Sequence, residues 1–220
     1  LVQFHRRFEQ QEHTTEQHDQ VTAGETVFEH LEQRLGQGHQ PGNTRQQAQA
    51  HQQGQGQTDQ PRAVALYLSG DMGFHAGLGP DVAERLTRQG IPVVAENSLH
   101  FFRTRRTPEE AGAMIADGLR RAIALDPDAR LLLLGQSFGA DVIAPSLPYV
   151  PTELRRRIAF IGLIVPGATR QWRASPSEIF SFNEPEEDAV IAAQKLSWTP
   201  LLCIHGADED SSLCPALRQS

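Results

Sequence analysis

Residues 130–139, RLLLLGQSFG, are the most informative part of this chain for its fold. An unbroken run of leucines bounded by a turn is typical of a strand that is buried on both faces of a sheet. The Gly-x-Ser-x-Gly pattern that follows predicts a tight turn into a helix, with Ser137 at its apex. Such a turn lifts the hydroxyl above the sheet, to a helix N-terminus where backbone N–H groups favour a developing negative charge. Ser137 is therefore a candidate nucleophile.

The rest of the chain after Arg62 alternates apolar runs with helical segments. The helix that begins after Thr107 has a capping pattern, with proline in its first turn and Glu110 three residues after the threonine. Strands that alternate with helices form βαβ units, so we expect an α/β fold with a mostly parallel sheet flanked by helices. The predicted strands are residues 63–68, 91–95, 130–134, 158–165 and 200–204, and the predicted helices are residues 81–89 and 108–125.

Residues 1–61 have a different composition from residues 62–220. The first 60 residues hold 16 glutamines and six of the nine histidines, with few aliphatic side chains. Such a segment buries too little apolar surface to offset the entropy lost on ordering. We predict a disordered tail over residues 1–61, with at most a short amphipathic helix around residues 27–35, and a folded domain over residues 62–220. The tail histidines have no regular spacing, so no metal site is predicted.

Charge and hydropathy exclude several classes of function. The net charge is −7, and no basic stripe of the kind that binds nucleic acid is present. The arginines at 155–157 are expected at a solvated helix end. No run approaches the roughly 20 apolar residues of a membrane span, and residues 1–7 contain no apolar core of a signal peptide. Because no glycine-rich phosphate loop follows a strand, no nucleotide cofactor is expected.

The two cysteines, Cys203 and Cys214, flank a single loop by composition. They are either two separate buried thiols or a disulfide that closes the loop, and the second reading implies an oxidising compartment. We favour the disulfide because these are the chain's two cysteines and they bracket one loop. The pair and His205 are too few ligands for a zinc site.

The other catalytic groups are predicted from the loops in which this architecture usually carries them. A second oxyanion donor is expected in the loop after the first strand, from the backbone N–H of Asp71 or Met72, alongside that of Phe138. The acid is expected after the last strand. There the spacing from Gly206 favours Glu209, with Asp210 or Asp208 as alternatives.

A general base is missing from the expected place. In this architecture the order along the chain is serine, acid, histidine, but the last histidine is His205 and the chain ends ten residues after Asp210. His75 and His100 precede the serine. Serine without a base is a poor nucleophile at neutral pH. We therefore expect the domain to be incomplete at its C-terminus, without the last strand and the histidine loop.

Several motifs together resemble the bacterial VirJ/AcvB virulence-protein family. They are Leu68–Asp71, Arg106–Glu109, the serine motif with its extension to Val142, and Cys203–Gly206 through Cys214–Pro215. The resemblance covers about residues 62–216 and implies a periplasmic α/β-hydrolase domain with Ser137 as nucleophile and a Cys203–Cys214 disulfide. It also implies hydrolysis of lysyl-phosphatidylglycerol, peripheral contact with the membrane and a link to type IV secretion proteins. The chain departs from the family at Met72, at Ser211 and in lacking a visible secretion signal.

Three classes of function remain open. The first is an esterase that cleaves an aminoacylated membrane lipid. The second is a general serine esterase or thioesterase with a small substrate, which a substrate panel separates from the first. The third is a non-catalytic periplasmic protein that binds or assists a secretion system, and the missing base favours it.

Overall fold

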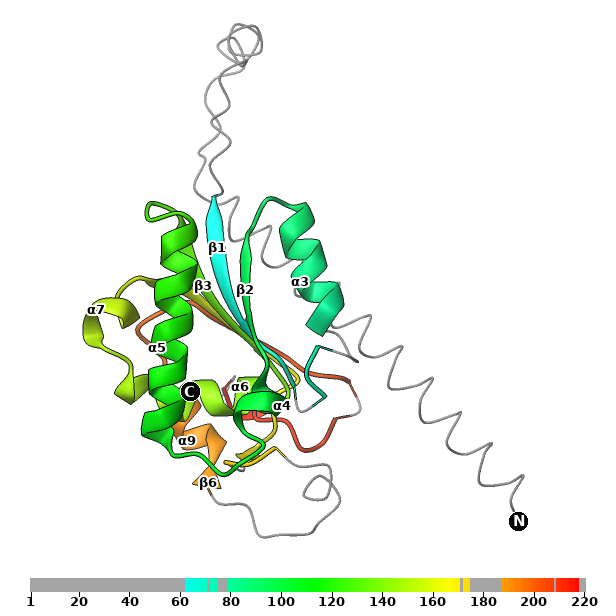
Figure 1. Cartoon of the computed structure of the whole chain (residues 1–220). Coiled ribbons are helices and arrows are strands. Elements are labelled where there is room, and N and C mark those ends of the chain that lie inside the picture. Colours follow the sequence, from blue (N-terminus) through cyan, green and yellow to red (C-terminus); the bar gives the residue numbers. More distant parts are fainter. Residues whose placement is uncertain are drawn as a thin grey trace, which may run out of the picture.

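A parallel five-stranded sheet forms the centre of the molecule in the computed structural model (Figure 1). The strands are arranged in the order β2-β1-β3-β4-β7 and all pairings are parallel. Their bounds are β1 (Ala63–Leu68), β2 (Val93–Glu96), β3 (Arg130–Gln136), β4 (Ile158–Ile164) and β7 (Leu201–Ile204). The structure describes residues 62–70, 72–74, 79–170, 172–174, 187–207 and 209–217. The predicted tail, residues 1–61, lies outside this part.

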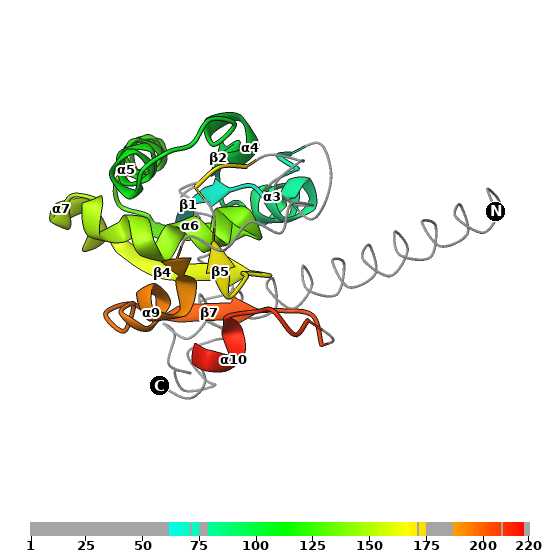
Figure 2. The same ribbon diagram turned by 90° about the horizontal axis from the view of Figure 1, so that it is seen from below.

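Helices cover both faces of the sheet. On one face, Val82 and Leu86 of α3 (Gly79–Arg88) pack in a cluster with Tyr67, Leu132 and Leu134. The other face is covered by α5, α6 and α9, whose apolar residues form the larger cluster. Figures 1 and 2 show α5 and α6 together on this face, and Figure 2 shows α10 beside β7, to which a disulfide joins it. The remaining bounds are α4 (Ser98–Phe101), α5 (Pro108–Leu125), α6 (Phe138–Ser146), η1 (Leu147–Tyr149), α7 (Thr152–Arg155), α9 (Ala189–Gln194) and α10 (Cys214–Leu217).

Helix α5 has the bounds that the sequence predicts. The Thr107 hydroxyl accepts a hydrogen bond from the backbone N–H of Glu110 at 3.2 Å, and the Glu110 carboxylate accepts one from the N–H of Thr107 at 2.9 Å. This reciprocal pair satisfies two amides that the first helical turn leaves without acceptors. The helix ends at Leu125 and its C-cap is Asp126, the residue before a proline, where a following proline disfavours helical backbone.

The short elements differ most from prediction. Strand β2 begins at Val93, two residues later than expected, because the N–H of Ile91 caps the end of α3 by donating to Leu86 O. Helices α9 and α10 and the antiparallel pair β5 (Thr169–Arg170) and β6 (Glu187–Asp188) were not predicted. Elements of two to six residues carry too little periodicity to be recognised in sequence. Arg155, expected in solvent, is half-buried.

The parallel arrangement brings the carboxyl ends of all five strands to one edge of the sheet. Ser69, Asn97, Ser137, Val165 and His205 are the residues that follow β1, β2, β3, β4 and β7. In open α/β sheets, ligands bind outside this edge.

None of the helices in the described ranges is long and apolar enough to cross a membrane.

Candidate active site

Ser137 has the strained backbone of a sharp strand-to-helix turn. Its φ and ψ angles are 47° and −125°, outside the regions that L-residues favour. Its N–H donates to Ile164 O at 2.8 Å, and its carbonyl accepts from Ala140 N at 2.7 Å and Asp141 N at 3.0 Å. Its hydroxyl makes no capping hydrogen bond to α6. The side chain is half-buried, so the hydroxyl remains available for other chemistry.

The glycines on either side of Ser137 are required by close packing. A Cβ on Gly139 would lie 2.3 Å from Ser69 O and 2.6 Å from Leu68 O, and one on Gly135 would lie 2.7 Å from Gly139 O. These contacts involve backbone atoms, which cannot move aside as a flexible side chain can. Gly139 is therefore required by the packing of this turn against the end of β1, and Gly135 by its packing against the start of α6.

Gln136, the residue between Gly135 and Ser137, connects the turn to the sheet through its side chain. The Gln136 side chain is buried, and its Oε1 accepts a hydrogen bond from the Tyr67 hydroxyl at 3.2 Å. Burial raises the pKa of Tyr67 well above its usual value, so the hydroxyl stays protonated and donates. The bond ties the serine turn to β1.

Two of the three residues predicted to supply oxyanion donors, Phe138 and Met72, are among the described residues. The N–H of Phe138 belongs to the first turn of α6, where amides have no acceptor within the helix. The loop after β1 also approaches the serine, because a Cβ on Gly70 would lie 3.4 Å from Ser137 Cβ. Asp71 lies outside the described residues. Met72 is described, and its side chain is 57% exposed.

The acidic loop after β7 is folded back on itself. The N–H of Gly206 donates to Glu209 Oε2 at 3.3 Å, and the N–H of Glu209 donates to Gly206 O at 3.3 Å. Glu209 is half-buried whereas Asp210 is exposed. Asp208 lies outside the described residues. The geometry therefore distinguishes the two described acids: the carboxylate of Glu209 is held in the loop, and that of Asp210 faces solvent.

Two histidines flank the serine at equal strand separations. His205 directly follows β7, and His100 lies in α4, four residues after the end of β2; β7 and β2 are each two places from β3. Adjacent strands lie about 4.8 Å apart, so the backbone of His205 is about 10 Å from that of Ser137. His100 is exposed. His205 Nδ1 is buried and has no hydrogen-bond partner in the described part of the chain. His75 lies outside that part.

The cysteines form a disulfide, Cys203–Cys214, with Cα atoms 5.5 Å apart. This confirms the disulfide over the alternative of separate thiols. The bond joins β7 to α10 and closes the loop that carries Glu209 and Asp210. The described residues contain no group of three or more histidine, cysteine or acidic side chains that could hold a metal ion.

The family model of the bacterial virulence protein (VirJ) matches residues 62–220. The chain belongs to this family. The match begins at the residue where the composition changes from the polar tail to the folded domain. It confirms the family resemblance found in the sequence motifs. The parallel sheet flanked by helices and the strained serine turn confirm the predicted α/β-hydrolase-like fold for the VirJ-like domain.

Solved structures resemble the VirJ-like domain at low sequence identity. A protein assigned to the α/β hydrolase superfamily from Xanthomonas campestris pv. campestris is 17% identical, with 66% of this chain and 86% of that one covered and a TM-score of 0.40. A mutant of the type II thioesterase YbtT of yersiniabactin biosynthesis is 17% identical, with coverages of 72% and 80% and a TM-score of 0.43. A Trichoderma reesei cutinase with a phosphonate inhibitor is 15% identical, with coverages of 77% and 72% and a TM-score of 0.37. No curated protein sequence matches the chain.

Sequence reasoning missed two supports of the VirJ-like site. Val165, after β4, has a φ of 52°, and its N–H donates to Ile204 O at 2.7 Å. Asp141, in the first turn of α6, accepts from the N–H of Gly167 at 2.8 Å and so holds the loop after β4 against the helix that begins at Ser137. An acidic residue in a first helical turn is a common sequence feature, so only its partner reveals this role.

Proposed function

We propose that this VirJ-family protein is a serine ester hydrolase with Ser137 as its nucleophile. The observation that carries the proposal is the strained backbone of Ser137 between two glycines that steric contact requires. Strain of this kind costs about 1–3 kcal/mol and persists where function benefits from it. Here it presents a hydroxyl at a helix N-terminus, on the edge of the sheet where ligands bind.

The reaction is acyl transfer in two steps. Ser137 Oγ attacks the ester carbonyl while a base takes its proton, and the alcohol leaves with a proton as the acyl-serine forms. Water then attacks the acyl-serine, releasing the acid and restoring the hydroxyl. The Phe138 N–H supports the oxyanion in both steps, and we assign the second donor to the N–H of Asp71. Glu209 is the preferred acid because its carboxylate is held in the loop, and Asp210 is the alternative.

The proposed substrate is lysyl-phosphatidylglycerol, as the VirJ resemblance implies. Attack at its aminoacyl ester releases lysine and leaves phosphatidylglycerol as the alcohol. A cationic aminoacyl group suits the negative charge of the loop that holds Glu209 and Asp210. Approach to such a lipid requires peripheral contact with a membrane. A general esterase or thioesterase with a small substrate is the alternative within the same chemistry.

The proposed location is the periplasm, in association with type IV secretion. The Cys203–Cys214 disulfide supports it, since disulfides persist in oxidising compartments. A non-catalytic accessory role is the second candidate function. It is favoured by one observation, that neither His100 nor His205 is hydrogen-bonded to the Ser137 hydroxyl within the described residues.

A fluorophosphonate probe tests the nucleophile. We expect covalent labelling of this chain that is lost in Ser137→Ala, with Ser146→Ala, a buried serine at the other end of α6, as the matched control. Repeating the labelling with His100→Gln and His205→Gln identifies which imidazole supplies the base. Equal labelling of Ser137→Ala and the unmodified chain would exclude Ser137, and complete lack of labelling would favour the accessory role.

A substrate panel tests the specificity of an active protein. Vesicles containing lysyl-phosphatidylglycerol, alanyl-phosphatidylglycerol or a neutral acyl ester are compared by the release of the acyl group. We expect Asp210→Asn to lower the rate for the lysyl lipid more than that for the neutral ester. The Asp210 carboxylate is an exposed negative charge of this loop, and it would attract the cationic lysyl group. Equal effects on all substrates would reject the electrostatic preference.

A further inference from the structure

The loop after β4 lies between the first turn of α6 and the loop after β7. On one side, the N–H of Gly167 donates to Asp141 Oδ1 at 2.8 Å. On the other side, Gly167 and Ser212 form an isolated antiparallel bridge. One short stretch of backbone, residues 165–168, therefore contacts both the helix that begins at Ser137 and the loop that carries the candidate acids.

Two hydrogen bonds join the loop after β4 to the acidic loop after β7. The N–H of Ala168 donates to Ser211 O at 2.6 Å, and the N–H of Leu213 donates to Pro166 O at 3.3 Å. These bonds lie on either side of the antiparallel bridge, as in a short ladder between two strands. Ser211 directly follows Asp210, so the ladder begins at the residue next to the acids.

The N–H of Gly167 points away from the acidic loop. Gly167 is the residue between the two ladder bonds, and in an antiparallel pair the N–H of such a residue faces the opposite side. The Asp141 carboxylate supplies its acceptor there. A hydrogen bond to a carboxylate is about twice as strong as one between neutral groups. The loop after β4 is thus held on both of its edges.

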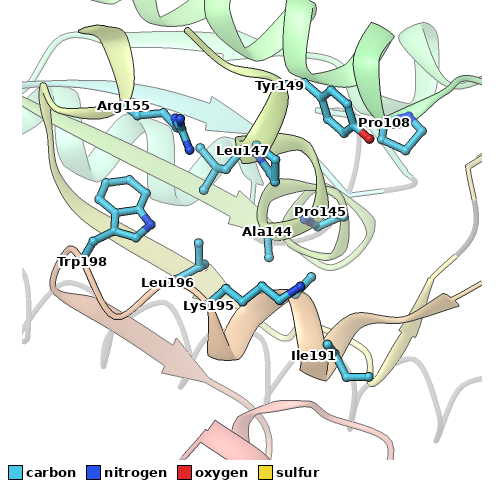
Figure 3. Close-up of a pocket in the computed structure, with 12 residues that line it drawn as sticks. Pro108, Ala144, Pro145, Leu147, Tyr149, Arg155, Ile191, Lys195, Leu196 and Trp198 are labelled. Carbon is cyan, nitrogen blue, oxygen red and sulfur yellow. The ribbon is translucent and has the colours of Figure 1, made fainter. Parts of the chain in front are cut away.

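Asp141 is itself fixed to the nucleophile turn. Its N–H donates to Ser137 O at 3.0 Å, within the first turn of α6. Figure 3 shows the other end of this helix, where Ala144 and Pro145 line a groove of about 560 Å³ instead. The hydrogen bond from α6 to the loop after β4 is therefore made by the turn that carries Ser137.

We propose that Asp141 is a positioning residue for acyl transfer at Ser137. It acts through the loop after β4, which it holds so that the acid of the loop after β7 keeps its place relative to the serine. The inference rests on the proposed function, in which Glu209 or Asp210 is that acid. A displacement of catalytic groups by about 1 Å can cost about 100-fold in rate. Loss of the Asp141 carboxylate releases the two loops and leaves the serine turn in place.

Amide hydrogen exchange, measured by NMR on the 220-residue chain, tests the link without any activity. In Asp141→Ala, the amides of Ala168 and Leu213 should exchange about 10-fold faster, because the loop after β4 has lost a hydrogen bond to a charged acceptor. The amide of Ile161, which donates to Pro200 O within the sheet, should be unchanged. Asp141→Asn retains an oxygen acceptor and should restore slow exchange. Unchanged exchange at Ala168 and Leu213 in the alanine variant would overturn the proposal.

The rate of fluorophosphonate labelling tests the catalytic consequence. We expect Asp141→Ala to slow labelling about 10-fold and Asp141→Asn to recover most of the rate. Asp117→Ala is the matched control, because Asp117 is an exposed acid on α5 that is hydrogen-bonded to Arg121 of the same helix. Equal slowing by the two alanine variants would overturn the proposal. An unmodified chain that takes no label would reject the hydrolase function and the catalytic role of Asp141, whereas the exchange rates still decide the link between the loops.

A double-mutant cycle separates positioning from a general loss of structure. Asp141→Ala is combined with Glu209→Gln and with Asp210→Asn, and the labelling rate is measured for each protein. If Asp141 acts through the acid, its effect should shrink from about 10-fold to about 3-fold or less once that acid is replaced. The same factor in every background would overturn the positioning role, because independent effects multiply.

Discussion

Ser137 and Val165 lie next to each other at the carboxyl edge of the sheet, and both have positive φ angles, 47° and 52°. The N–H of Ser137 donates to Ile164 O, and the N–H of Val165 donates to Ile204 O. They are the two non-glycine residues with positive φ in the described part of the chain. For a β-branched residue this conformation is a true outlier. Backbone strain is thus concentrated on two adjacent turns, one of which carries the candidate nucleophile.

The strain at Ser137 predicts an unusual order of stabilities. Ser137→Gly should have a higher free energy of unfolding than Ser137→Ala, by about 1 kcal/mol. Glycine relieves strain of about 1–3 kcal/mol and costs about 0.5–1 kcal/mol in chain entropy. Urea denaturation of the two variants, neither of which has the hydroxyl, gives the difference. A more stable alanine variant would show that the turn is not strained.

The packing of Gly139 predicts a severe effect of one methyl group. Gly139→Ala should lower the free energy of unfolding by about 3 kcal/mol or more, because the Cβ would contact the backbone carbonyls of Leu68 and Ser69. It should also abolish fluorophosphonate labelling. Gly206→Ala is the matched control: the nearest atom to its Cβ is Glu209 Cβ at 3.8 Å, and we expect a change within about 0.5 kcal/mol. Similar denaturation midpoints for the two variants would contradict the steric argument.

The disulfide predicts a redox-dependent stability. Removal of the bond in the Cys203→Ser/Cys214→Ser double variant should lower the free energy of unfolding by about 2–4 kcal/mol, mainly because the unfolded chain gains freedom. Dithiothreitol should lower the thermal midpoint of the unmodified chain to that of the double variant and leave the variant unchanged. A midpoint insensitive to the reductant, with the thiols shown to be free, would mean that the bond does not stabilise the fold.

The buried Tyr67 predicts a loss of stability at alkaline pH. Burial raises the pKa of Tyr67 in the folded protein, whereas in the unfolded chain it is about 10. Below pH 10 both states are protonated and the contribution is fully present. Above it the unfolded state ionises first, so stability falls as pH rises. Urea denaturation between pH 8 and 11 should show a shallower decline for Tyr67→Phe. Tyr149→Phe is the comparison: the pKa of Tyr149 is also raised, by a hydrogen bond and the charge of Glu109, but its side chain is exposed, so its effect should be smaller, and an equal effect of both variants would reject the assignment.

Much of the site follows from the sequence because its signals are local. The strand before Ser137, the two glycines and the position of the turn lie within residues 130–139, and the structure places them as predicted. The capping box fixes the start of α5 in the same way. The sequence does not decide which acid of the loop after β7 serves the site. Three acids follow one another there, and only the conformation of the loop gives them different positions. The structure separates Glu209 from Asp210, while Asp71 and Asp208 lie outside the described residues and their roles stay predictions.

The alternation of strands and helices, the serine turn and the family follow from the sequence alone, because periodicity, turn residues and motifs act over a few positions. For the two cysteines the sequence favoured a disulfide, and the structure confirms it. The other features of the site could be seen only in the folded structure. The order of the strands places Val165 next to Ser137 and His205 at the same edge of the sheet, and the Asp141–Gly167 hydrogen bond joins residues 26 positions apart. These relationships depend on packing between distant segments, whose free energy is not encoded in any single stretch of the chain.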